Sequence, residues 1–409
     1  MRILLLPCLA LFVSSTVFAQ ADPPNVKPDP AYKKAFQAGE YEQARQLIRQ
    51  QLNTTPDDPE LLYFMAYTLD RLNNYESKDP TLYHDLTLQS SAYLERLIQL
   101  NPEYTGELYL LDPYEKLSAI WGSQAMHYLV YEQPDSANWC FAQGRERGGF
   151  TDPMLQLARH ILQSCEEDAV LLSSGDMMTF TLMYAQHLLA YRTDVLVFDI
   201  NLVNTDWYVE YLQKQFDHPA LSMIELTNYP LNSSLSQRTI LLERDGCMDT
   251  GPFEWSFKAP YEGEQFLRSH LVLIDLVRSV HPQHPIRFTP GFPPSQTLGL
   301  TYDIFYTDLA GRLSLCPDGT AEEASQLSNL EIIGLDDTSI LHSPGTINLL
   351  QFYRMAYLHQ VDFLYGESQI DQAKALFQEM QERIPEKTVP QVYESIGLIT
   401  KDWERIFAE

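Results

Sequence analysis

The chain has 409 residues, and its 55 Asp and Glu against 28 Lys and Arg give a formal net charge of −27 at pH 7. A protein this acidic repels phosphate backbones and anionic lipid headgroups, which argues against nucleic acid and membrane surfaces as partners. The length is sufficient for two or three hydrophobic cores.

Residues 1–19 have the pattern of a secretory signal peptide. Arg2 precedes an apolar run at 3–13, and the residues at 17–19 predict cleavage after Ala19. The alternative, a membrane anchor, is disfavoured because the run is too short to span a bilayer and contains Pro7. We therefore expect a periplasmic or secreted protein with no integral membrane segment after cleavage.

Four cysteines lie outside the signal peptide. An exported protein meets an oxidising compartment, but a chain of this size does not need disulfides to fold. One disulfide and four buried thiols are equally compatible with the sequence, and no C-x-x-C or zinc-type spacing is present. We expect neither a metal nor a cofactor. The four residues are Cys140, Cys165, Cys247 and Cys316.

After a Pro-rich lead at 20–30, residues 31–165 carry a recurring helical pattern. A small residue is followed four positions later by an apolar one, and in three of the four sets a helix-ending Pro comes after, which is typical of the second helix of a tetratricopeptide repeat; the fourth set has a small, large, small spacing. Residues 341–409 repeat the pattern, so we predict helix pairs at both ends of the chain that stack into an arm. The matching sets are Ala44, Ile48 and Pro56; Ser90, Leu94 and Pro102; Ala137, Phe141 and Gly144; and Ala373, Phe377 and Pro385.

Residues 166–340 have a different texture, in which short apolar runs alternate with helical stretches. Such alternation predicts a mostly parallel sheet with helical crossovers. The fold class that we predict is therefore mixed, with tetratricopeptide-like helical hairpins flanking an α/β domain. The expected strands lie at 168–174, 195–200, 239–243 and 286–289, the expected helices at 177–190, 204–215 and 264–280, and a strand or helix at 302–315.

Two segments of the α/β domain should reach the carboxyl ends of the strands, where ligands bind in open parallel sheets. In a functional interpretation a glycine admits backbone N–H groups to a ligand, the acids accept hydrogen bonds, and the aromatic rings stack on it. In a structural interpretation the polar residues cap helices and the rings pack on the sheet, and this one is favoured about two to one. The candidate ligand-binding residues are Ser174, Gly175, Asp176 and Thr179 in the first segment, and Asn204, Thr205, Asp206, Trp207 and Tyr208 in the second.

The common catalytic signatures are missing: the sequence has no G-x-S-x-G, no phosphate-binding glycine loop and no H-E-x-x-H. We therefore name no catalytic residue and favour binding over catalysis. A hydrolase that uses Asp176 and Asp206 as its two carboxylates stays a minor alternative.

Five short motifs stand out in the middle of the chain: Gly175-Asp176, Thr179-Phe180, Tyr184-Ala185-Gln186, Arg192-Thr193-Asp194-Val195 and Asn204-Thr205-Asp206-Trp207-Tyr208. With these motifs the region resembles the soluble extracytoplasmic C-terminal region of bacterial membrane proteins related to protein O-mannosyltransferases. The resemblance is weaker over 163–385 as a whole, and it implies an α/β plus tetratricopeptide module.

Two departures limit what the resemblance implies. We expect the membrane region that would hold the transferase chemistry to be absent, so no transferase activity is carried over. Where the family has Asn and a second Asp after the Gly-Asp turn, this chain has Met177 and Met178, which weakens a polar site there. We expect a non-enzymatic module that recognises a protein or peptide through its helical repeats. The alternative is a carbohydrate-binding or glycosylation-associated role for the strand ends.

Overall fold

The computed structural model describes most of the chain. The described residues are 29–73, 82–215, 218–235, 239–243, 251–260, 265–281, 283–316, 327–333, 335 and 343–408. The predicted signal peptide, most of the Pro-rich lead and Cys247 lie outside these ranges.

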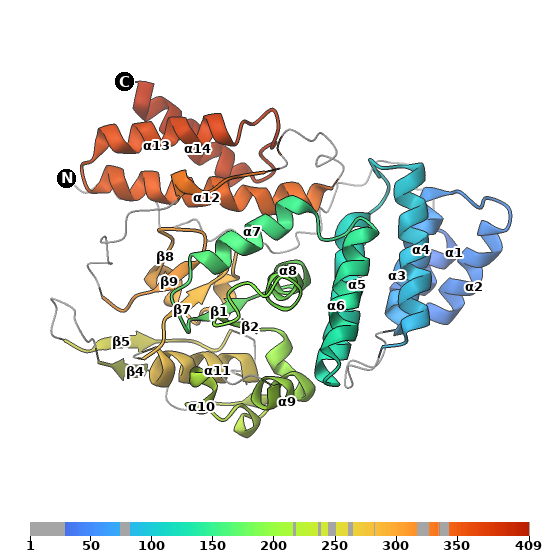
Figure 1. Cartoon of the computed structure of the whole chain (residues 1–409), viewed down its shortest axis with the longest axis horizontal. Helices are drawn as coiled ribbons and strands as arrows, with labels where there is room; N and C mark the ends of the chain where they lie inside the picture. The colour runs from blue at the N-terminus through green and yellow to red at the C-terminus, as the bar shows by residue number, and fades with distance from the viewer. Residues whose placement is uncertain are drawn as a thin grey trace.

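Six consecutive helices, each packed against the next, form a row that we call the arm (residues 31–146; Figure 1). The residues that carry the predicted spacing point into the interior: Ala44, Ile48, Ala137 and Phe141 are all completely buried. A small residue between two large ones lets neighbouring helix axes approach closely. The helices are α1 (Ala31–Gln37), α2 (Tyr41–Leu52), α3 (Pro59–Asn73), α4 (His84–Leu100), α5 (Pro113–Val130) and α6 (Pro134–Glu146).

The central sheet has the strand order β2-β1-β7-β9-β8. Strands β1, β2 and β7 are parallel, and β9 runs antiparallel to both β7 and β8. The predicted mixed fold with a mostly parallel sheet is thus confirmed, and 302–315 contributes two strands. The bounds are β1 (Val170–Ser173), β2 (Leu196–Asp199), β7 (Ile286–Phe288), β8 (Ile304–Phe305) and β9 (Gly311–Leu313).

Helices cover both faces of this sheet, because alternate residues of each strand point to opposite sides. Val170 and Leu172 pack in one hydrophobic cluster with α9 (Asp206–Gln215) and α11 (Arg268–Asp275). Leu171 packs in another with α7 (Asp152–Gln163), α8 (Asp176–His187) and the C-terminal helices. The parallel strands are short and mostly apolar because they are buried on both sides.

One predicted strand lies outside the sheet. β4 (Thr239–Leu242) was expected to join the parallel strands, but it pairs antiparallel with β5 (Phe253–Ser256). Trp255 and Leu242 on this hairpin are buried in the core, so a local partner satisfies the strand without a crossover. A second small ladder joins β3 (Asn232–Ser233) to β6 (Phe266–Leu267), and α10 (Pro219–Ser222) precedes it.

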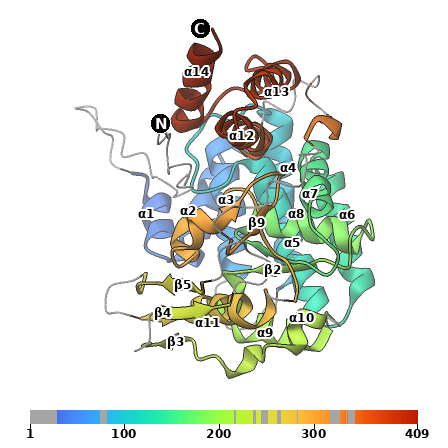
Figure 2. The same ribbon diagram turned by 90° about the vertical axis from the view of Figure 1, so that its left-hand side faces the viewer.

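The C-terminal helices lie on the side of the sheet opposite to the β4–β5 hairpin (Figure 2). They are α12 (Pro344–Gly366), α13 (Ile370–Arg383) and α14 (Glu394–Ala408), and α12 contacts α7, α5 and both other helices. Ala373 and Phe377, from the repeat-like spacing, are buried in this group.

The described cysteines differ in state. Cys140 and Cys165 are free and buried, whereas Cys316 is disulfide-bonded, so the alternative of four free thiols is wrong. Within the described ranges, no helix is both long enough and apolar enough to cross a membrane.

Candidate functional site

The turn between β1 and α8 is shaped by Gly175, whose φ of +90° is rarely adopted by residues with a side chain. The turn brings Thr179, in the first turns of α8, back to the strand ends. The Thr179 hydroxyl lies 3.0 Å from the Ser173 hydroxyl and donates to the Asp199 carboxylate at the end of β2. Adjacent strand ends are thereby tied together by three buried polar side chains.

Asp199 organises the loop after β2. Its Oδ1 accepts hydrogen bonds from the backbone N–H groups of Asn201 at 2.8 Å and Leu202 at 2.9 Å, while its Oδ2 accepts from Thr179. Burial raises the pKa of Asp199, and these hydrogen bonds oppose that rise. Such a saturated carboxylate holds the loop in place and has little capacity left for a ligand.

The aromatic and hydroxyl residues of the second predicted segment have structural contacts. The Tyr208 hydroxyl is buried and accepts from the Asp199 N–H at 2.9 Å. The Thr205 hydroxyl donates to the Leu202 carbonyl at 2.7 Å. Trp207 is half-buried against the core, with its ring edge-on to Tyr208. The stacking role considered for the two rings therefore has little open surface.

Asn204 and Asp206 are held by α11. The Asn204 Oδ1 accepts from the Ser269 N–H at 3.0 Å, at the N-terminus of α11, where backbone N–H groups lack helical partners. The buried Arg268 guanidinium donates to Asp206 at 2.5 Å and to the carbonyl oxygens of Tyr229 and Val203. Since Asp206 is engaged by Arg268, the pairing of Asp206 with Asp176 in a hydrolase has no support.

Three loops meet at the surface of the strand ends. The Asn201 side-chain amide donates to the Ser174 hydroxyl at 3.0 Å, and its carbonyl accepts from the Gln296 amide at 2.7 Å. Ser174 follows β1, Asn201 follows β2, and Gln296 belongs to the segment after β7. This exposed chain of hydroxyl and amide groups, together with Gly175 and Asp176, is called the strand-end site below.

Asp176 is the one candidate acid of this site that has no hydrogen-bond or ion-pair partner among the described residues. Its side chain reaches solvent. The surrounding protein still limits the hydration of the carboxylate and raises the pKa of Asp176 to about 6, while the Lys116 charge opposes the shift. An unpaired carboxylate in the first turn of a helix can accept hydrogen bonds from a ligand or pair with a positively charged group of the ligand.

The arm contributes three of the charges that act on Asp176, beside that of Asp199. Lys116 of α5 is paired with Asp70 of α3 at 2.6 Å, and the charges of Asp70 and Arg71 also influence the pKa of Asp176. The Arg71 guanidinium lies 5.5 Å from the ring centre of Tyr109. We call these four residues, Asp70, Arg71, Tyr109 and Lys116, the arm surface. Sequence reasoning did not connect them to the strand ends, since they precede the site by more than fifty residues.

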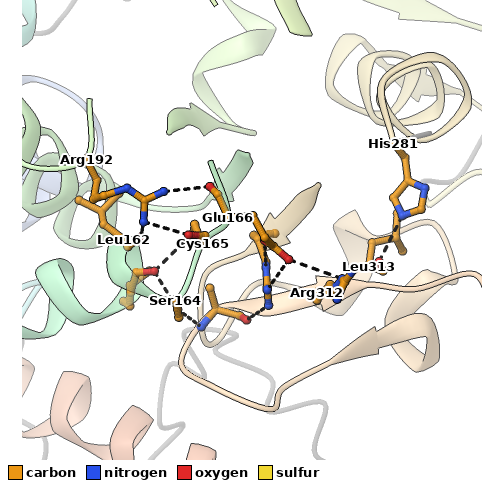
Figure 3. A network of polar contacts seen from close by, with 11 residues as sticks. Leu162, Ser164, Cys165, Glu166, Arg192, His281, Arg312 and Leu313 are labelled. Atoms are coloured by element: carbon orange, nitrogen blue, oxygen red, sulfur yellow. Dashed lines mark hydrogen bonds and ion pairs between the residues drawn. The ribbon is translucent and has the colours of Figure 1, made fainter. Parts of the chain in front are cut away.

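The opposite edge of the sheet carries a second polar network (Figure 3). Arg287 is 2% exposed and makes two 2.7 Å bonds to the Glu166 carboxylate. Arg192 donates to the Leu162, Cys165 and Glu166 carbonyl oxygens at 2.9 Å, which caps the end of α7. These groups are saturated by one another.

A small pocket of about 190 Å³ adjoins this network, lined by His160, Cys165 and Glu166 among others. Burial raises the pKa of the Cys165 thiol to about 12 and lowers the pKa of His160 to about 4. A protonated thiol is a poor nucleophile at neutral pH. Within the described residues, no group of three or more His, Cys, Asp or Glu could hold a metal ion.

A family model described as TMEM260-associated domain 2 matches residues 154–242, which are 89 of the 409 residues. The matched part begins in α7 and ends at β4, so it includes the turn at Gly175, the loop at Asn201 and the network around Arg192. No curated protein and no solved structure matches the chain significantly.

Proposed function

We propose that this chain is an exported, non-enzymatic binding module that holds a segment of a polypeptide partner between the arm surface and the strand-end site. The observation that carries the proposal is Asp176, an exposed carboxylate without a described partner whose pKa is influenced by the charges of the arm surface. The acidic net charge favours a partner segment with basic residues.

The arm side offers apolar contacts for such a segment. Leu108, Tyr109 and Leu110, in the loop before α5, are 41%, 45% and 58% exposed. Three consecutive exposed apolar residues are unusual on a surface that has no binding role. The loop is firmly held, because the Tyr63 hydroxyl accepts from the Tyr109 N–H at 2.9 Å and donates to the Leu111 carbonyl at 2.8 Å.

The link to glycosylation supports an accessory role. The matched family is named for its association with TMEM260, which is itself associated with protein O-mannosylation. The sequence resemblance, independently, is to relatives of protein O-mannosyltransferases. A module that positions a polypeptide for modification by another enzyme is consistent with both.

Peptide selection against the full chain tests the proposal. A displayed library of random peptides is selected on the wild type, and enriched peptides are titrated against Asp176→Asn and Leu110→Ser. We expect each substitution to weaken binding about tenfold or more, since either removes a group worth roughly 1.4 kcal/mol.

Two controls match these variants. Asp371→Asn changes an exposed acid in the first turn of α13, and Leu398→Ser changes an exposed leucine of α14. Neither should alter binding. Failure to enrich any peptide, or equal affinities for Asp176→Asn and Asp371→Asn, would contradict the proposal.

A carbohydrate ligand is the second candidate, favoured by the linked groups of Ser174, Asn201 and Gln296. Hydroxyl and amide groups beside a carboxylate are the usual donors and acceptors for sugar hydroxyls. A glycan array would identify ligands, and calorimetry with Asn201→Ala and Asp176→Ala would test them against Asn53→Ala, an exposed residue at the end of α2. An array without any bound glycan would rule this candidate out.

A further inference from the structure

The arm and the C-terminal helices meet at one buried carboxylate. Asp112 is the N-cap of α5, and its Oδ1 accepts from the backbone N–H groups of Tyr114 at 2.8 Å and Glu115 at 2.9 Å. Its Oδ2 accepts from the Ser343 hydroxyl at 3.0 Å and the Gly345 N–H at 2.9 Å, at the start of α12. A single side chain thus satisfies the N-termini of two helices far apart in sequence.

A second acid is pressed into the same junction. Among the described residues, the Glu115 Oε2 accepts one hydrogen bond, from the Asp112 N–H at 3.3 Å. A Cβ added to Gly345 would lie 1.8 Å from the Glu115 carboxyl carbon, so the Glu115 side chain lies directly against the α12 backbone. Neither acid forms an ion pair with a described residue.

The two acids cannot both ionise cheaply in this environment. Burial raises the pKa of Asp112, but its four donors and the two converging helix N-termini oppose that rise and favour its charged form. Glu115 accepts a single longer hydrogen bond, and burial together with the Asp112 charge raises the pKa of Glu115 to about 8. The other titratable groups that sense the pair are neutral phenols: Tyr63 and Tyr114 beside Asp112, and Tyr393 beside Glu115.

We propose that this junction is a pH-sensitive latch. While Asp112 and Glu115 share one proton, they join the arm to α12, and when that proton is lost, α12 is released from the arm. In the closed latch Asp112 is the anion and Glu115 the neutral acid. Loss of the Glu115 proton places two negative charges together against Gly345, and repulsion drives α5 and α12 apart. The latch is independent of what the strand-end site binds.

The latch also reaches that site through α5. Lys116 follows Glu115 in the chain, and its charge acts on Asp176. A movement of the first turn of α5 therefore changes the separation between the arm surface and the strand-end site.

Pulsed electron paramagnetic resonance tests the latch in the full chain, with spin labels at Gln50→Cys on α2 and Gln378→Cys on α13. Both positions are exposed, and the free native thiols at Cys140 and Cys165 are buried. We expect the distribution of distances between the two labels to shift or broaden between pH 6.5 and pH 9.5, two values that bracket the Glu115 pKa of about 8. Glu115→Gln, which cannot ionise, should keep the low-pH distribution throughout.

The matched control is Glu382→Gln, an exposed glutamate of α13, which should show the wild-type shift. If Glu115→Gln does not fold, hydrogen exchange of the Glu115 and Gly345 amides in the wild type, corrected for intrinsic pH dependence, supplies the test. Their protection should fall several-fold across the same pH range. An unchanged distribution in the wild type, or the same shift in Glu115→Gln, would overturn the latch.

Discussion

The amino ends and the carboxyl ends of the parallel strands, called the amino edge and the carboxyl edge, carry the same kinds of residue in different roles. At the amino edge, Glu166 and Asp194 are bound by arginines, and every guanidinium nitrogen of Arg287 and Arg192 donates at least one hydrogen bond. At the carboxyl edge, Asp176 is left without a described partner beside exposed hydroxyl and amide groups. The difference shows that a polar network whose hydrogen-bonding groups are paired with one another is structural, whereas a surface whose groups are left unpaired is able to bind.

The largest effect is expected at the amino edge. Glu166→Ala leaves the buried Arg287 guanidinium with only the Ala310 carbonyl as a described partner, which should lower the free energy of unfolding by about 3 kcal/mol. Urea unfolding measures this. Arg312→Ala is the control, because Arg312 is half-exposed and 3.6 Å from Glu166, and it should cost less than about 1 kcal/mol. Equal losses would show that this edge is not held by the Arg287 pair.

A smaller loss is expected beneath the strand-end site. Asp199→Ala removes the acceptor for Thr179 and for two backbone N–H groups, and should cost about 2 kcal/mol. Thr179→Val removes one of these donors and should cost less. Calorimetric melting of both variants orders them. A larger loss from Thr179→Val would mean that Asp199 does not organise the loop.

At the carboxyl edge the stability should barely change. Asp176 binds its proton more tightly in the folded chain, so its contribution is complete below about pH 4 and is lost as the pH rises through about 6. Asp176→Asn should therefore match the wild type at pH 4 and be equal or slightly more stable at pH 7, within about 0.5 kcal/mol. A clear loss at pH 7 would show that the Asp176 carboxylate is a structural group like Glu166.

The smallest effect concerns the electrostatic link between the arm and Asp176. Arg71→Gln removes a positive charge that lowers the pKa of Asp176, so that pKa should rise slightly. Carboxyl carbon NMR titration measures the shift. Arg405→Gln, on α14, should leave it unchanged, and equal titration curves for both variants would place Arg71 too far from the site to matter.

Local patterns predicted the helices and two central strands well. Ala44 and Ile48, or Ala137 and Phe141, lie within one helix, so their spacing directly reports a buried face. The strand at 196–199 begins with three apolar residues and is buried on both sides. These features depend on near neighbours in the sequence.

The partners that decide the candidate site are remote in sequence. The sequence alone allows Asp206 to be a ligand residue, but Arg268, which lies 62 residues later, donates a hydrogen bond to it. Gln296 joins Asn201 across 95 residues, and no local pattern marks it. Only Asp199 carried a usable signal, since an Asp at the end of a strand typically accepts a hydrogen bond from the backbone N–H two residues later, here that of Asn201. Similarly, β4 could not be assigned to a sheet without knowledge of β5.

The bond between Asp112 and Ser343 also constrains how the protein can be divided. It spans 231 residues and closes the chain into a circuit, so that the first and last groups of helices are neighbours across the α/β segment. A fragment that ends before Ser343 keeps the Asp112 carboxylate but loses half of its donors. A fragment that begins after Asp112 leaves α12 with an incomplete cap. Cutting the chain between these segments therefore breaks contacts between residues that are distant in sequence. The natural unit for expression and folding runs from the arm through α12.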